Sequence, residues 1–104
     1  MRIVETPAFT RKIDALLTDV EYWQLQDALV ERPAAGALIP GGQGLRKLRW
    51  AIPSKGRGKR GGIRVIYYWQ EGELLYLIAA YEKSQREDLT QAQVKAFVKT
   101  IQED

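Results

Sequence analysis

Two short amphipathic helices are predicted near the start of the chain, because apolar residues recur there every three or four positions. Thr6, followed by proline, is typical of a helix start, and the apolar spacing after it continues to about Leu17. Thr18 and Glu21 have the spacing of a capping box, which predicts a second helix ending near Arg32. We expect these helices to form a hairpin that packs one apolar face on a sheet.

Four segments have the alternation, or the content of β-branched and aromatic residues, that is typical of strands. They are residues 2–5, 45–52, 63–70 and 73–81. The pair Glu71-Gly72 between the last two is a two-residue turn signal, so these two segments are predicted to form a β-hairpin. Residues 33–44 and 53–62 are rich in glycine and are expected to be loops.

A final helix is predicted after Thr90, which forms a second capping-box pattern with Gln93 and precedes apolar residues at helical spacing. The predicted element order is therefore β-α-α-β-β-β-α, an α+β arrangement. A chain of 104 residues, of which 45% are hydrophobic, is long enough for one core. We expect a single domain over residues 1–104.

The chain contains neither cysteine nor histidine, which excludes several classes of site. Disulfides, zinc fingers, thiolate nucleophiles and Ser-His-Asp triads are all ruled out. Any general acid or base must be Lys, Tyr, Asp or Glu.

The first residues lack the pattern of a secretion signal, and no apolar run approaches the roughly 20 residues that a membrane span needs. These two observations predict a soluble, cytoplasmic protein with no membrane contact.

The net charge of +3 conceals a strong segregation of charge along the chain. Between Pro33 and Gln70 there are eight basic residues and no acidic one. They are Arg46, Lys47, Arg49, Lys55, Arg57, Lys59, Arg60 and Arg64. Such a patch suits a polyanion, because each phosphate that it neutralises releases counterions and adds salt-dependent affinity. The alternative is a solvated basic loop without a partner.

Arg64 stands out because it interrupts an apolar strand. A buried unpaired charge costs several kcal/mol, so this side chain must reach solvent, a carboxylate or a ligand. If Lys47 and Arg49 of the preceding strand share its face, three cations line one surface. The alternative is a structural ion pair with Glu73 or Glu82.

These residue types are sufficient for one kind of RNA cleavage, in which the 2′-hydroxyl attacks the adjacent phosphate. Arg and Lys can stabilise the charge that develops on the phosphate. A Lys crowded by other cations, or Tyr68 or Tyr81, can transfer protons. The same surface would suit a non-catalytic module that binds RNA or DNA, or a domain that docks on an acidic protein partner, so these alternatives stay open.

Two short motifs point elsewhere, and we interpret both as coincidental. Gly41-Gly42-Gln43 matches the tripeptide of peptide-release factors, but the rest of that domain's pattern is absent. Gly58-Lys59 lacks the spacing and the following Ser or Thr of a phosphate-binding P-loop.

Over nearly its whole length the sequence resembles the RelE/HigB superfamily of type II toxin–antitoxin ribonucleases, and in particular its HigB-like branch. The resemblance is carried by residues 44–49, 56–68, 77–83 and 88–90. Its most specific part is the run G-K-x-G-G-x-R-V-I-Y from Gly58 to Tyr67. The resemblance implies a RelE-like α+β fold, in which a small, mostly antiparallel sheet carries an N-terminal helical hairpin and a C-terminal helix.

The resemblance also implies a function. Members of this kind enter the ribosomal A site and cleave translated mRNA without a metal ion or other cofactor. A cognate antitoxin, here expected to be a helix-turn-helix protein of the HigA type, neutralises them. The implied partners are therefore the antitoxin, the ribosome and mRNA, with operator DNA contacted only through the antitoxin.

By position, the resemblance assigns catalytic roles to Lys47 and Arg49 on the strand that lines the active site. Arg64 is similar to the arginine that contacts the scissile phosphate, and Lys83 to the residue that assists the leaving group. The remaining basic residues are expected to bind RNA: Arg46, Lys55, Arg57, Lys59 and Arg60.

The general base is not assigned by the resemblance. Related toxins often carry a tyrosine shortly after the position of Lys83, and Leu89 stands there in this chain. Lys47, Lys59 and Tyr81 remain candidates, with Tyr68 as a further residue that could transfer a proton.

Overall fold

A computed structural model of the chain describes residues 1–52, 62–82 and 89–102. Within these residues the strands form one five-stranded sheet in the order β1-β5-β4-β3-β2, in which β1 runs parallel to β5 and the other neighbours are antiparallel. The strands are β1 (Arg2–Glu5), β2 (Ala37–Leu38), β3 (Leu45–Trp50), β4 (Ile63–Gln70) and β5 (Leu74–Glu82). The helices are α1 (Pro7–Leu16), α2 (Asp19–Glu31) and α3 (Gln91–Gln102). The predicted α+β class is confirmed.

The helices begin where local side-chain caps predict that they do. The Thr6 hydroxyl accepts a hydrogen bond from the Phe9 amide at 3.1 Å. Thr18 and Glu21 form the full capping box, and Thr90 makes the same reciprocal pair of bonds with the glutamine three residues later. Each cap satisfies amide groups that the first helical turn would leave unpaired.

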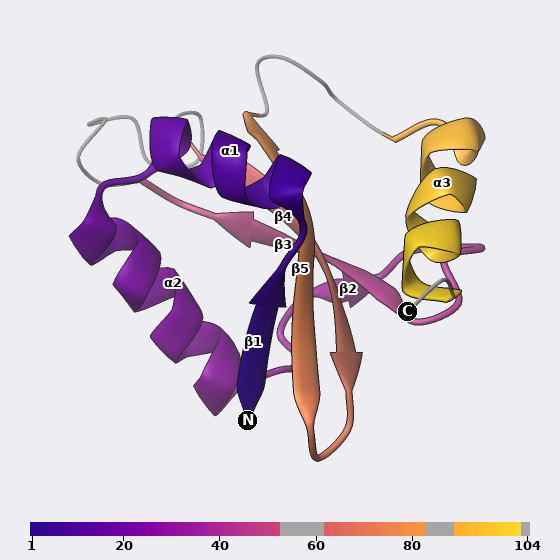
Figure 1. The fold of residues 1–104 in the computed structure, drawn as a ribbon, viewed down its shortest axis with the longest axis horizontal. Coiled ribbons are helices and arrows are strands. Elements are labelled where there is room, and N and C mark those ends of the chain that lie inside the picture. The colour runs from indigo at the N-terminus through magenta and orange to yellow at the C-terminus, as the bar shows by residue number, and fades with distance from the viewer. Residues whose placement is uncertain (53–61, 83–88, 103–104) are drawn as a thin grey trace.

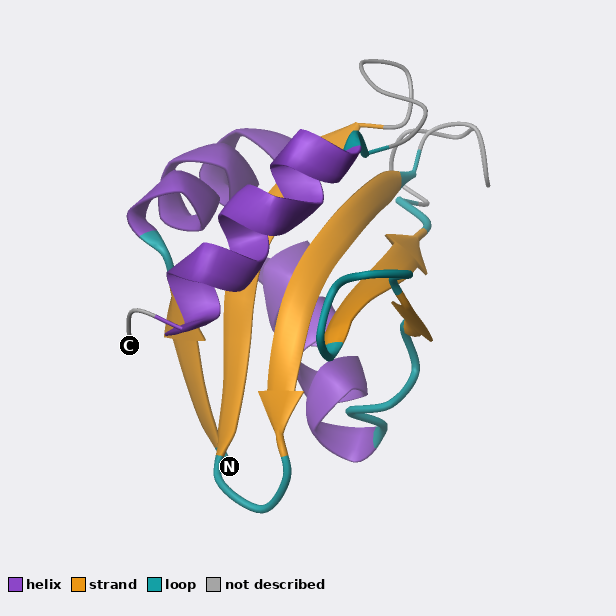
Figure 2. Cartoon of the chain, turned by 90° about the vertical axis from the view of Figure 1, so that its right-hand side faces the viewer, coloured by secondary structure: helices purple, strands orange, loops and turns teal. Residues whose placement is uncertain are grey.

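Both faces of the sheet are buried, by different helices (Figure 1). On one face α1 and α2 pack over a core that includes Phe9, Ile13, Leu25, Leu29, Tyr67 and Leu77. On the other face α3 packs over a core that includes Leu45, Ile66, Ile78, Val94 and Val98. Figure 2 shows the molecule from its α3 side. Because both faces of the sheet are covered, the central strand β4 carries apolar side chains toward both helix layers, as strands buried on both sides require.

A β-bulge interrupts the pairing of β4 with β5. Ile66 pairs with Ala79, whereas the next residue of β4 pairs with Leu77, so Ile78 is an extra residue in β5. An extra residue reverses the alternation of every side chain beyond it. Tyr81 consequently lies on the same face as Ile78, in the core under α3.

The structure differs from the predicted elements in three places. The short strand β2 lies within the segment predicted to be entirely loop, where Ala37 pairs with Lys47 of β3. β3 ends at Trp50, two residues earlier than expected. The hairpin loop holds three residues rather than two, because Gln70 pairs with Leu74.

The segment before β2 is held by two side chains that are distant in sequence. The Tyr67 hydroxyl accepts a hydrogen bond from the Gly36 amide at 2.8 Å and donates one to the Pro33 carbonyl at 2.6 Å. The Arg46 guanidinium donates to the carbonyls of Gly36, at 2.8 Å, and Ala34, at 3.2 Å. Burial raises the pKa of the Tyr67 hydroxyl, which keeps it protonated as a donor. These hydrogen bonds between distant residues hold the segment before β2 next to β3.

A second tyrosine ties α2 to β1. The Tyr22 hydroxyl donates a hydrogen bond to the Glu5 carboxylate. Burial, together with this carboxylate, raises the pKa of Tyr22. The hairpin of helices is thus fixed to the sheet edge by a polar contact as well as by its apolar face.

No helix in the described part of the chain is long and apolar enough to cross a membrane.

We predict that Tyr67→Phe lowers the free energy of unfolding by about 1–3 kcal/mol, because it leaves the buried Gly36 amide without its acceptor. Urea denaturation measures the change. The matched control is Tyr68→Phe, whose hydroxyl has no hydrogen bond within the described residues, and it should change stability by less than about 0.5 kcal/mol. Equal effects of the two substitutions would contradict the role of the Tyr67 hydroxyl.

Candidate functional site

Three side chains that the sequence singled out form a row across the middle of the sheet. Arg49 of β3 lies directly opposite Arg64 of β4, and Arg64 lies directly opposite Tyr81 of β5. Alternation along each strand places all three on the α3 face of the sheet. Directly opposite residues have their Cβ atoms about 4.5–5.5 Å apart, so these three side chains are neighbours. We call Arg49 and Arg64 the arginine row.

Arg64 is buried, with 8% of its surface exposed. In the described residues its guanidinium makes one hydrogen bond, from Nη1 to the Ile63 carbonyl at 3.3 Å, and no ion pair with a carboxylate. Glu82 pairs with Ile63 and so points to the opposite face, and Glu73 precedes β5 at its far end. The alternative of an ion pair with either glutamate is therefore not supported.

The pairing of Arg49 with Arg64 is electrostatically unfavourable. Like charges directly opposite each other on one face destabilise a sheet. A guanidinium has five N–H donors in a planar fork that matches two oxygens of a phosphate. An anion bound between the two arginines would offset their repulsion, so the pair favours a phosphate ligand.

A groove of about 380 Å³ lies beside this row, between β2, β3 and the start of α3. It is lined by Ala37, Leu38, Ile39, Pro40, Lys47, Arg49, Leu89, Gln91 and Val94. Two cations of β3 line this groove, and most of its other lining is apolar. The cations suit a phosphate backbone, and the apolar side chains suit an unstacked base.

The two candidate tyrosines are placed differently. Tyr81 neighbours Arg64, whereas Tyr68 is four residues along β4 from Arg64, which is roughly 13 Å of strand. The Tyr68 ring packs against the core under α3. The structure therefore brings Tyr81, and not Tyr68, to the arginine row.

Arg46 lies apart from the other cations of its strand. Alternation places it on the α2 face, where it holds the backbone carbonyls before β2. Lys47 and Arg49 share the groove, but Arg46 does not line it. Arg46 therefore has a structural role, and its expected role in RNA binding stays a prediction.

Five of the predicted site residues lie outside the described residues. They are Lys55, Arg57, Lys59 and Arg60 of the predicted basic loop, and Lys83.

Sequence reasoning missed the apolar lining of the groove and Gln91. Gln91 is the first residue of the helix predicted after Thr90, so its position at a helix start was available from the sequence. Leu38 had no comparable signal, because β2 depends on tertiary contacts. The Gly41-Gly42-Gln43 tripeptide forms the turn from β2 to β3, and the Gln43 side chain accepts a hydrogen bond from α3.

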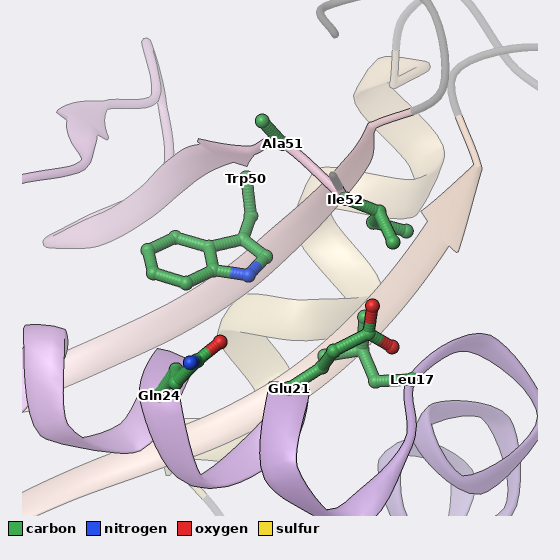
Figure 3. A pocket seen from close by; sticks show the side chains of 6 residues that line it. All are labelled: Leu17, Glu21, Gln24, Trp50, Ala51 and Ile52. Carbon is green, nitrogen blue, oxygen red and sulfur yellow. The ribbon is translucent and has the colours of Figure 1, made fainter. Parts of the chain in front are cut away.

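A second hollow, of about 250 Å³, lies on the opposite face of the sheet (Figure 3). It is lined by Leu17, Glu21, Gln24, Trp50, Ala51 and Ile52. Glu21, the one charged residue of this lining, caps α2 through its bond to the Thr18 amide. The described residues that line this hollow offer no cation to a phosphate. Among the described residues, no three acidic side chains gather closely enough to hold a metal ion.

The chain was compared with models of known protein families. The model described as the RelE toxin of the RelE/RelB toxin-antitoxin system matches residues 1–103.

We predict that Arg64→Met raises the free energy of unfolding in chloride buffer by at least about 1 kcal/mol, because it removes a buried charge that faces Arg49. Replacing chloride by inorganic phosphate at equal ionic strength should raise the melting temperature of the wild type but not of this variant. Thermal and urea denaturation measure both effects. Arg11→Met on α1 is the control and should leave the phosphate response intact. Destabilisation by Arg64→Met in chloride would show that Arg64 has a structural partner.

Proposed function

Because the chain belongs to the RelE toxin family, we propose that it cleaves mRNA in the ribosomal A site as a ribosome-dependent endoribonuclease. Toxins of this family inhibit translation, are generally endoribonucleases and partner with an antitoxin. Within the family we place the chain in the HigB-like branch, on the run from Gly58 to Tyr67.

The observation that carries this proposal is the buried Arg64, which lies opposite Arg49 and has no carboxylate partner among the described residues. In our proposal these two guanidinium groups bind the non-bridging oxygens of the scissile phosphate. Their charge stabilises the extra negative charge that forms as phosphorus becomes five-coordinate. Lys47 and the groove beside it hold the adjoining nucleotide.

The proposed reaction needs no group beyond the RNA and the protein. The 2′-oxygen loses its proton to a base and forms a bond to phosphorus, and the bond from phosphorus to the 5′-oxygen breaks. The 5′-oxygen takes up a proton, so the products are a 2′,3′-cyclic phosphate and a 5′-hydroxyl. Lys83 assists this leaving oxygen, as the resemblance implies.

Of the two tyrosines, Tyr81 is the one that the geometry favours as the base, and Lys47 and Lys59 stay candidates. It is adjacent to Arg64, so a 2′-hydroxyl beside the bound phosphate lies nearer to it than to Tyr68. The basic residues Lys55, Arg57, Lys59 and Arg60 bind the RNA backbone in this proposal, which suits their lack of neighbouring acidic residues in the sequence.

We expect Arg64→Met to reduce cleavage of translated mRNA by about 100-fold or more, since it removes a donor aimed at developing charge. Primer extension in a purified translation system, with and without ribosomes, maps new RNA ends. Arg11→Met, an exposed change on α1, should cleave like the wild type.

The same gels separate the alternatives. New ends only on translated message support the proposal. Ends on naked RNA would indicate a free ribonuclease instead. If the folded wild-type protein produces no ends in either condition but binds RNA, it is a non-catalytic binding module.

Substitution of the two tyrosines tests the assignment of the base. Tyr81→Phe should slow single-turnover cleavage by about 100-fold or more, as expected for loss of a proton-transfer group. Tyr68→Phe should change the rate by less than about threefold, because Tyr68 lies along the strand from the arginine row. A larger effect at Tyr68 than at Tyr81 would reverse the assignment.

A further inference from the structure

The outer side of α2 carries three large apolar side chains that face solvent. Val20, Trp23 and Val30 are 66%, 64% and 45% exposed. With Asp27 they follow a spacing of three, four and three residues, which places all four on one side of the helix. The opposite side of α2 is already buried in the core through Leu25 and Leu29. We call these four exposed residues the α2 seam.

The position of the α2 seam leaves it open to a partner. In Figure 1, α2 forms one edge of the molecule, and the sheet lies only on its inner side. A helix that is apolar on its outward side as well as its inward side is usually covered on both. The hollow between α2 and Trp50 borders this surface through Gln24, and it provides a recess for an additional apolar side chain (Figure 3).

The charge of α2 specifies the chemistry of that partner. The helix carries four acidic residues and no basic one, in a chain whose net charge is +3. Asp27 lies within the seam itself, and Asp19, Glu21 and Glu31 lie along the same helix. A complementary surface therefore combines apolar side chains at helical spacing with Lys or Arg opposite Asp27.

Two other occupants fit poorly. A second copy packed through the same helix would bring two sets of four carboxylates together, and like charges across an interface are unfavourable. RNA would meet the same negative charge with its phosphates. The groove that we propose for RNA lies on the α3 face of the sheet, away from α2.

We infer that the α2 seam is the docking site for a basic amphipathic helix of the antitoxin. This inference rests on the proposed function for the identity of the partner, since toxins of this family pair with an antitoxin. Trp23 is the expected anchor of the interface, because tryptophan is enriched among the residues that dominate binding energy. Asp27 fixes the orientation of the helix through a charge pair.

The experiment measures binding of the full-length cognate antitoxin to the full-length toxin. The double substitution Val20→Ser/Trp23→Ser should weaken binding by at least about 30-fold. Asp27→Lys should weaken it by about 10-fold and remove part of its salt dependence. Asp14→Lys is the matched control for charge reversal, since Asp14 is exposed on α1, and it should change the affinity by less than about threefold.

All of these side chains are exposed, so each variant should keep the melting temperature of the wild type within a few degrees. If the double variant does not fold, Asp27→Lys with Asp14→Lys as its control decides the outcome. Wild-type affinity in both Val20→Ser/Trp23→Ser and Asp27→Lys would overturn the inference, as would failure of the antitoxin to bind the wild-type chain.

The same preparations are assayed for cleavage of translated mRNA in the absence of antitoxin, where the variants should match the wild type. If the wild type fails to cleave but the seam variants still lose antitoxin binding, the proposed catalytic function is wrong and the docking site stands. If cleavage is intact and antitoxin binding is unaffected by the variants, the docking site is wrong and the catalytic function stands.

Discussion

The pairing of β5 with β4 sets the face on which each side chain of β5 lies, and this pairing contains one extra residue, Ile78. Before it, Leu77 fills the core under α1 and α2, and after it Tyr81 enters the core under α3. The packing of β5 against both helix layers and the position of Tyr81 beside Arg64 depend on that register. Without the bulge, alternation would carry Tyr81 away from Arg64.

Much of the fold could be predicted because its signals are local. The Thr18 hydroxyl accepts a hydrogen bond from the amide three residues later, and the Thr90 hydroxyl does the same. These two helix starts could therefore be predicted from short stretches of sequence. The strand β2 could not, because it depends on hydrogen bonds from Tyr67 and Arg46, which follow it by up to about thirty residues. The bulge at Ile78 has no local marker such as glycine.

The candidate site was predictable where it depends on the alternation of side chains along a strand. Alternation placed Lys47, Arg49 and Arg64 on one face, because β3 and β4 pair without interruption. It could not choose between Tyr68 and Tyr81, since that choice depends on the bulge. The charge pattern could not show that the Arg46 guanidinium donates to backbone carbonyls on the other face, and its expected role in RNA binding stays a prediction.

The parallel pairing of β1 with β5 joins two strands that are far apart in the amino-acid sequence. Arg2 to Glu5 pair with Leu74 to Leu77, so β1 can join the sheet only after β5 has been synthesised. The N-terminal helices likewise complete their core only against β4 and β5. Non-local pairing of this kind slows folding and makes it depend on the synthesis of β5. A nascent chain that stops before β5 therefore has neither a finished core nor Tyr81 beside Arg64, so structural integrity and the candidate site arise in the same step of synthesis.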